Sequence, residues 1–339
     1  MKCISKRKKA AALLGVFVIG LTGCTSKEVV LENAYDVCDT SAKYGITENG
    51  ASQSAEFFAR DLVVTEDENL GLEKTTERVA EAAGVFLTSK KEAVYKKNIF
   101  EKLYPASTTK ILTAYVALKN GNLDDVVTVS ANAANQASDS SVCELKEGDK
   151  ITLRDLLYGL MLRSGNDAAV AIAEHISGSS EEFVVLMNAE AKALGATGSH
   201  FVTPNGLHDE EHYSTVYDMY LFMNAAVKNE TFLEIIKSSH YTANYTDAAG
   251  NPVTKEWDST NKYLMGTEPM PEGVTVIGGK TGTTGEAKYC LVQYNENTAK
   301  EPVISIVLKA DSRDNMYLLM SEMLKNFANL CCIFRRDIL

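Results

Sequence analysis

The stretch Tyr104-Pro105-Ala106-Ser107-Thr108-Thr109-Lys110-Ile111-Leu112-Thr113-Ala114 decides how this chain is interpreted. Pro105 and the apolar residues after it predict a largely buried helix over residues 107–119. Ser107 and Lys110 are three positions apart, so they share one face of that helix. A serine hydroxyl attacks a carbonyl only when a nearby base takes its proton. The spacing therefore predicts a nucleophile, Ser107, and its base, Lys110.

A serine at a helix start also has a purely structural use. Its side-chain oxygen can cap the first backbone N–H groups, which would explain Ser107 or Thr108. It does not explain Lys110, because a helix N-terminus repels cations. A lysine buried there would have a lowered pKa, as a base requires. The pattern alone is weak, since Ser5 and Lys8 repeat it.

Two further motifs follow in order and strengthen this prediction. Ser164-Gly165-Asn166 comes after an apolar helix, and Lys280-Thr281-Gly282 comes after a glycine-rich strand. The first could simply be a turn that caps the next helix, and the second a solvated hairpin rim. A turn on a rigid scaffold can nevertheless aim Ser164 and Asn166 into a cleft. An edge strand carrying Lys280 could bind an extended substrate by strand addition.

Hydrophobic periodicity predicts the order of the elements. A strand over residues 82–87 and its return over 93–95 precede the helix of Ser107. Helices follow at 153–162, 167–176, 181–194 and 215–226. Strands resume at 274–277, 289–294 and 303–308, and a helix runs over 315–330. This order indicates an α/β (α+β) fold, in which helices flank an antiparallel sheet and an all-helical subdomain is inserted at about 120–260.

The N-terminus has the features of a processing segment. A basic run at residues 6–9 precedes an apolar stretch, 10–20, that is short for a membrane span. Leu21-Thr22-Gly23-Cys24 resembles a bacterial lipobox, which predicts a lipoprotein signal peptide over 1–23 and a lipidated Cys24. An ordinary signal peptide or an uncleaved anchor is the alternative. Residues 24–78 are then expected to be a tether and extension, and 331–339 a short tail.

Composition argues against several other functions. The net charge of −11 does not favour nucleic acid, whose binding relies on basic residues. The cysteines show no regular spacing and no CxxC pair, so neither a disulfide framework nor a zinc site is expected. His208-Asp209-Glu210-Glu211-His212 spaces two histidines as in a zinc motif, but Pro204-Asn205-Gly206 predicts a loop there. We expect no metal and no cofactor.

Taken together, these motifs resemble those of the D-alanyl-D-alanine carboxypeptidases, the low-molecular-mass penicillin-binding proteins. The resemblance covers about residues 79–330 and implies a β-lactamase/DD-peptidase-like catalytic domain. The similar segments are Leu103-Tyr104-Pro105-Ala106, Leu162-Arg163-Ser164-Gly165-Asn166-Asp167-Ala168-Ala169, Thr203-Pro204-Asn205-Gly206-Leu207-His208 and Gly278-Gly279-Lys280-Thr281-Gly282-Thr283-Thr284.

The resemblance implies a role for each motif residue. Ser107 would form an acyl-enzyme with a peptidoglycan stem peptide ending in D-Ala-D-Ala, with Lys110 as base and Ser164 as proton relay. Asn166 would hold the substrate amide. The terminal carboxylate would be bound by Lys280, Thr281 and, less closely matched, Arg313. Gly282, within the same motif, would also belong to the substrate-binding residues. The N–H groups of Ser107 and Thr283 would form the oxyanion hole, and β-lactams would be trapped at Ser107.

Two other functions remain open at this stage. A serine β-lactamase on the same fold would need fast deacylation, and no clear ExxLN-type segment follows Asn166. A non-catalytic, penicillin-sensing or wall-binding lipoprotein is the other. A preference for endopeptidase or transpeptidase chemistry also stays open. In each case we expect an extracytoplasmic protein, held through Cys24 at the outer face of the cytoplasmic membrane.

Overall fold

A five-stranded antiparallel sheet forms the centre of the fold. A computed structural model describes residues 58–330, and the chain from Asp61 onward forms one compact unit. The strands lie in the order β2-β1-β9-β8-β7. Their bounds are β1 Ala80–Leu87, β2 Glu92–Lys97, β7 Val274–Thr284, β8 Lys288–Asn297 and β9 Pro302–Ala310. The terminal strands predicted from periodicity are thus confirmed, and β7 is an edge strand.

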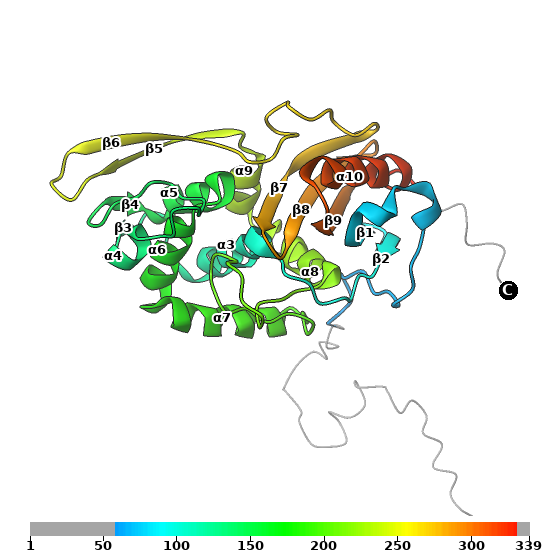
Figure 1. Cartoon of the computed structure of the whole chain (residues 1–339), viewed down its shortest axis with the longest axis horizontal. Coiled ribbons are helices and arrows are strands. Elements are labelled where there is room, and N and C mark those ends of the chain that lie inside the picture. The colour runs from blue at the N-terminus through cyan, green and yellow to red at the C-terminus, as the bar shows by residue number, and fades with distance from the viewer. Residues whose placement is uncertain (1–57, 331–339) are drawn as a thin grey trace, which may run out of the picture. The chain divides into compact units, whose positions relative to one another are not determined.

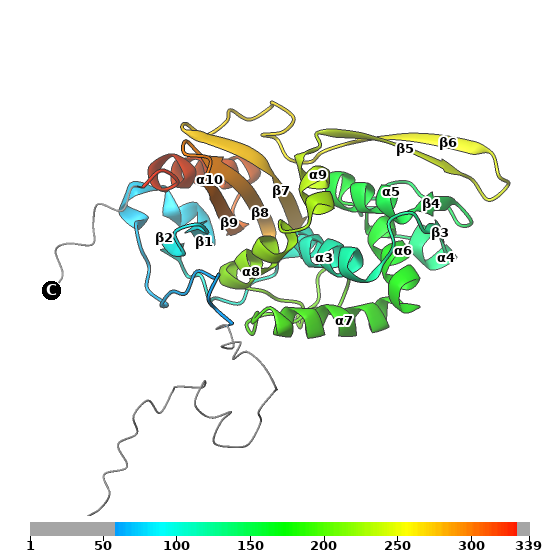
Figure 2. The same ribbon diagram turned by 180° about the vertical axis from the view of Figure 1, so that it is seen from behind.

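Helices cover both faces of this sheet. α10 (Arg313–Phe327) packs on one face, and α8 (Val216–Ala226) packs on the other (Figures 1 and 2). The sheet residues alternate between the two cores, as a period of two requires. Leu291 faces α10, for example, whereas its neighbour Val292 belongs to the core shared with α8.

The remaining helices pack around the helix that starts at the Ser107 motif. Ser107 lies in the 3-10 turn η3 (Ala106–Thr109), which continues into α3 (Lys110–Asn120). Its neighbours are α6 (Asn166–Ser177), α7 (Ser180–Ala193) and α9 (Glu230–Lys237), with α4 (Ala131–Ala134) and α5 (Leu153–Tyr158) beyond. Most of α3 is buried, which confirms the prediction of a central helix.

The expected all-helical insertion is wrong in one respect. The segment between 120 and 260 also contains a second antiparallel sheet, in the order β3-β4-β5-β6. Its strands are β3 Val126–Thr128, β4 Lys150–Thr152, β5 His240–Thr246 and β6 Pro252–Asp258. Tyr241, Ala243 and Tyr245 alternate with more exposed residues along β5, a strand pattern that the helical expectation overlooked. The long β5–β6 hairpin lies along the helical region in both views (Figures 1 and 2).

The compact unit also starts earlier than the expected residue 79. Val63 is fully buried, and its N–H donates to the Tyr220 hydroxyl at 2.9 Å. Leu70 and Lys96 exchange two backbone hydrogen bonds at the edge of β2. Two 3-10 turns, η1 (Leu72–Lys74) and η2 (Glu77–Val79), then lead into β1. Residues 61–78 therefore belong to the folded unit.

The predicted signal peptide, Cys24 and the tail at 331–339 lie outside the described residues. Within residues 58–330, none of the helices has both the length and the apolar character to cross a membrane.

Candidate active site

The nucleophile and base predicted from the sequence are in contact. The Lys110 Nζ lies 2.9 Å from the Ser107 Oγ, because the turn η3 and the first residue of α3 put both side chains on one side. Lys110 is fully buried, whereas Ser107 reaches the surface of a cavity. A substrate in the cavity can thus reach Ser107 but not the Lys110 amine.

The other two contacts of the amine define its chemistry. Lys110 Nζ donates to the Asn166 Oδ1 at 2.8 Å and to the Asn205 carbonyl at 2.6 Å. An uncharged amine has two hydrogens and one lone pair. With both hydrogens used by these acceptors, the lone pair faces the Ser107 hydroxyl. The arrangement therefore suits a neutral lysine that accepts the serine proton.

Electrostatics favour that neutral form. Burial is the main cause that holds the pKa of Lys110 well below its ordinary value, and the charge of Lys280 lowers this pKa further. Cys143 and Asp167 act in the opposite direction. Among residues 58–330, no carboxylate forms an ion pair with Lys110. A buried, unpaired amine is the usual state of a lysine that works as a general base.

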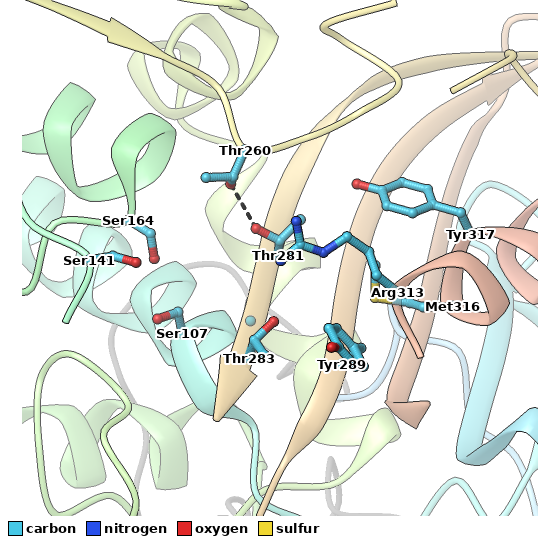
Figure 3. A pocket seen from close by; sticks show the side chains of 11 residues that line it. Ser107, Ser141, Ser164, Thr260, Thr281, Thr283, Tyr289, Arg313, Met316 and Tyr317 are labelled. Carbon is cyan, nitrogen blue, oxygen red and sulfur yellow. Dashed lines mark hydrogen bonds between the residues drawn. The ribbon is translucent and has the colours of Figure 1, made fainter. Parts of the chain in front are cut away.

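The cavity next to Ser107 lies between the helical region and the edge of the sheet. It has a volume of about 220 Å³. Ser107, Ser141 and Ser164 lie on one side, and the hydroxyls of Thr281 and Thr283 on β7 lie opposite (Figure 3). The remaining lining residues are Thr260, Gly282, Tyr289, Arg313, Met316 and Tyr317. Hydroxyl groups dominate the wall nearest to the nucleophile.

A strained turn presents Ser164 to this cavity. The α5 helix continues into a π-helical turn, η4 (Gly159–Arg163), which ends at Ser164 with φ 63°. A positive φ is uncommon for a residue other than glycine and marks a position that its surroundings hold in place. The Gly165 N–H donates to the Gly159 carbonyl at 3.1 Å and closes this turn. At the start of α6, the Asp167 carboxylate accepts the N–H groups of Cys143, Leu145 and Ala168, which holds the loop that carries Ser141.

Gly282 allows strand β7 to approach the nucleophile. A Cβ added at Gly282 would lie 3.0 Å from the backbone N of both Ser107 and Thr108. Few side chains tolerate such a distance, so glycine permits the close approach. The backbone of β7 therefore runs directly past the N–H of Ser107.

A family model supports the same assignment from sequence. The model described as D-alanyl-D-alanine carboxypeptidase matches residues 73–312. The chain belongs to the D-alanyl-D-alanine carboxypeptidase family.

Individual relatives agree with this membership. DacF of Bacillus subtilis (strain 168) is 39% identical over 226 residues, which are 64% of this chain and 55% of the relative. DacC of Escherichia coli (strain K12) is 38% identical over 63% of this chain and 52% of the relative. Both are described as D-alanyl-D-alanine carboxypeptidases. This family member thus spans about half the length of these two relatives.

A solved structure in the family has the same fold. The Streptomyces K15 DD-transpeptidase superposes with a TM-score of 0.68 and 33% identity, covering 78% of this chain and all of that one. The curated D-alanyl-D-alanine carboxypeptidase from Streptomyces sp. (strain K15) is 36% identical over 65% of this chain and 77% of the relative.

The structure brings together most of the predicted site residues of this family member. Ser107, Ser164, Thr281, Gly282, Thr283 and Arg313 line the cavity, and Lys110 and Asn166 lie directly behind it. Arg313 stands above the Tyr289 ring, 5.9 Å from the ring centre, and its guanidinium points toward Thr281 (Figure 3). Its position suits a carboxylate ligand next to the Thr281 hydroxyl.

Lys280 lies differently from a direct carboxylate ligand. It is 1% exposed, it does not line the cavity, and its Nζ donates to the Thr281 carbonyl at 2.9 Å. Burial lowers its pKa to about 7. The charge of Lys280 is close enough to Lys110 to lower the pKa of that amine.

Sequence reasoning missed several residues of the site. Ser141 and Tyr289 line the cavity from segments without a motif. Asn205 lies in one of the segments that resemble the family, but it contacts Lys110 through its carbonyl, so the side-chain pattern gave it no role. Thr260 belongs to Ser259-Thr260-Asn261, which repeats by chance the Ser-x-Asn pattern of Ser164-Gly165-Asn166. The Thr260 hydroxyl lies 2.7 Å from that of Thr281.

Proposed function

We propose that this protein is a serine D-Ala-D-Ala carboxypeptidase that removes the terminal D-alanine from peptidoglycan stem pentapeptides. The observation that carries the proposal is the contact of the buried Lys110 amine with Ser107, at the edge of a cavity lined by Thr281, Thr283 and Arg313. Membership of the family supports the same chemistry.

The first step forms an ester and releases D-alanine. Lys110 takes the proton of the Ser107 hydroxyl, and the oxygen attacks the carbonyl carbon of the penultimate D-alanine. A C–O bond forms and the C–N bond breaks. Ser164 relays a proton to the leaving nitrogen, so that D-alanine departs as an amine. Asn166 keeps its Oδ1 on Lys110, which leaves its Nδ2 for the substrate amide.

Backbone groups stabilise the charge that develops on the carbonyl oxygen. The N–H of Ser107, beside Gly282, and the N–H of Thr283 form the proposed oxyanion hole. The terminal carboxylate of the substrate lies by Thr281 and Arg313, with the buried amine of Lys280 held at the Thr281 carbonyl.

The second step is hydrolysis of the ester. Water attacks the carbonyl carbon, the ester C–O bond breaks, and the proton returns to Ser107 through Lys110. A β-lactam acylates Ser107 in the same way, but its ring-opened leaving group stays attached, so release is slow. An amine in place of water would give transpeptidation instead, and the name of the Streptomyces relative keeps this alternative in view.

We further propose that the enzyme works outside the cytoplasm, where peptidoglycan lies. The lipobox-like Leu21-Thr22-Gly23-Cys24 supports an anchor in the cytoplasmic membrane through a lipidated Cys24. Labelling with a fatty acid, lost in Cys24→Ala, tests this part separately.

The test of the activity is D-alanine release from a pentapeptide. Wild-type protein should release one D-alanine per peptide, and Ser107→Ala should release none. Absence of release from the wild type would refute the proposal. Turnover of a chromogenic cephalosporin at many cycles per second would favour a β-lactamase instead, whereas neither activity would favour a penicillin-sensing lipoprotein.

A further inference from the structure

His212 is a buried histidine that the proposed chemistry does not use. It belongs to the segment His208–His212, which forms a loop as its sequence predicts. The ring is 1% exposed and packs edge-on against Phe201, with ring centres 5.3 Å apart. Such a side chain is held in one orientation.

Both nitrogens of the His212 ring have partners. The backbone N–H groups of Val202 and Thr203 point at Nδ1, at 3.2 and 3.3 Å. Nε2 lies 2.9 Å from the Thr109 hydroxyl. A ring nitrogen that accepts N–H groups carries no proton, so the proton of neutral His212 is on Nε2. Nε2–H therefore donates to Thr109, the residue next to Lys110.

The loop that His212 holds also contacts the general base. Asn205, two residues after Thr203, offers its carbonyl to the Lys110 amine at 2.6 Å. The neighbouring Pro204 carbonyl accepts the Thr113 hydroxyl at 2.6 Å. At Gly206, with φ +83°, an added Cβ would lie only 2.0 Å from the Ala106 carbonyl. The loop is thus closely fitted against the start of α3.

We propose that His212 is a positioning residue for the Lys110 base. Its Nδ1 fixes the 202–206 loop, so that the Asn205 carbonyl orients the amine and excludes water from it, and its Nε2–H fixes the turn that carries Ser107. This inference rests on the proposed function only for its kinetic part. The effect on Lys110 itself is a property of the folded protein.

The charged groups around both side chains are consistent with this role. Burial is the main cause that lowers the pKa of His212 to about 4. The charge of Asp209 raises this pKa, whereas those of His200, Lys110 and His208 lower it further. His212 therefore stays neutral wherever the enzyme is expected to work. Around Lys110, the groups that face it are Lys280 on β7, Cys143, and Asp167 on α6.

Two substitutions distinguish the contribution of Nδ1 from that of Nε2. His212→Asn leaves an oxygen near the position of Nδ1 and loses the contact with Thr109. His212→Gln leaves an amide near Nε2 and loses the acceptor for the loop. His175→Gln is the control, since His175 pairs with Asp125 at the end of α6 and has no contact with the cavity.

The first measurement is the titration of Lys110 in the full chain, by NMR of lysines labelled at the ε-carbon, with Lys110→Ala for assignment. His212→Gln should move the midpoint toward the ordinary lysine value, because water reaches the amine. His212→Asn should move it less, and His175→Gln should not move it. An unchanged midpoint in His212→Gln would overturn the proposal.

The second measurement is acylation by a fluorescent penicillin at saturating concentration. His212→Gln should slow the acylation step by about tenfold to a hundredfold, as small misplacements of a catalytic group do, while penicillin affinity stays within about twofold. His212→Asn, which keeps an acceptor for the loop and loses only the contact with Thr109, should slow the step less than His212→Gln does. An acylation rate in His212→Gln equal to that of wild type, or affinity falling together with rate, would contradict the positioning role.

These measurements distinguish failure of the proposed function from failure of the role proposed for His212. If wild-type protein is not acylated, the proposed function fails, and the Lys110 titration still decides the role of His212. If neither variant folds, ¹⁵N NMR of the wild-type ring decides. A neutral ring that carries its proton on Nε2 down to about pH 4 supports the proposal, and a neutral ring with its proton on Nδ1 refutes it.

Discussion

The hydroxyls of Thr260 and Thr281 lie 2.7 Å apart across the top of the cavity. The Thr260 N–H also donates to the Leu162 carbonyl at 3.2 Å, so this residue joins the Ser164 side of the cleft to β7. For Thr281 to donate its hydrogen to a substrate carboxylate, it must accept the hydrogen of Thr260. The two hydroxyls then act as a short donor chain.

Thr260→Val should therefore weaken substrate binding more than chemistry. Loss of one hydrogen bond to a group that binds a charge predicts about a threefold to tenfold rise in KM, with kcat nearly unchanged. Steady-state release of D-alanine measures both constants. In a Thr281→Val background the same substitution should have no further effect, and an additive loss would contradict the donor chain.

Gly282→Ala should slow acylation without unfolding the protein. The added Cβ meets the backbone N of Ser107 and Thr108 at 3.0 Å and the Pro105 carbonyl at the same distance. The turn η3 must then shift away from β7, which separates the two oxyanion donors. A loss of about a hundredfold in the acylation rate is expected, the size of losing one donor.

Gly285→Ala is the matched control for that variant. An added Cβ there has no heavy atom within 4 Å, so its acylation rate should equal that of wild type. The account of the β7 contact fails if both glycine variants react at the wild-type rate, as measured with a fluorescent penicillin.

The rate of reaction should depend on pH through both lysines. Lys110 must be neutral to accept a proton, so acylation rises with pH until its lowered pKa is passed. Lys280 attracts the substrate carboxylate only when charged, and its pKa is about 7. KM should therefore rise above about pH 7, which gives a bell-shaped profile of kcat/KM. Loss of the alkaline limb in Lys280→Met would confirm its assignment, and an unchanged limb would refute it.

The same lowered pKa predicts that Lys280→Met stabilises the fold. The unfolded chain binds a proton more readily than the folded one between the folded pKa, about 7, and the ordinary value of 10.5. The burial of Lys280 therefore lowers the free energy of unfolding by its full amount below pH 7. This loss shrinks as the pH rises toward the ordinary lysine pKa. At pH 6 the variant should gain up to about 5 kcal/mol of unfolding free energy, since the pKa falls from 10.5 to about 7 on folding and one pKa unit is worth about 1.4 kcal/mol.

Urea unfolding at pH 6 and pH 10 measures this gain. It should shrink at the higher pH, because pH 10 lies well above the folded pKa and close to the ordinary value of 10.5, so most of the cost of burying the charged amine is gone. An equal gain at both values would mean that packing, rather than charge, is responsible.

The site could be predicted from the sequence where side chains act in regular spacing. Ser107 and Lys110 lie one helical turn apart, and the two later motifs lie at a turn and on an edge strand, so local pattern determined their roles. Asn205 could not be found this way, because it acts through its carbonyl. Ser141 and Thr260 reach the cavity only through tertiary contacts, the Asp167 carboxylate and the base of the β5–β6 hairpin.

The fold shows the same division. Strands β1, β7, β8 and β9 are apolar or glycine-rich and were predicted, as was the buried helix α3. The β5–β6 hairpin was missed because its inward residues Tyr241, Ala243 and Tyr245 pack on the helical region rather than on a sheet, and polar residues separate them. The start of the domain was placed too late because the burial of Val63 depends on distant Tyr220.

The central claim is that Ser107 is the nucleophile activated by Lys110. Mass spectrometry after incubation with penicillin tests it most directly. Wild-type protein should gain the mass of one penicillin on the peptide that contains Ser107, and Ser107→Ala and Lys110→Met should gain none. An adduct on another residue, or no adduct on the wild type, would contradict the account.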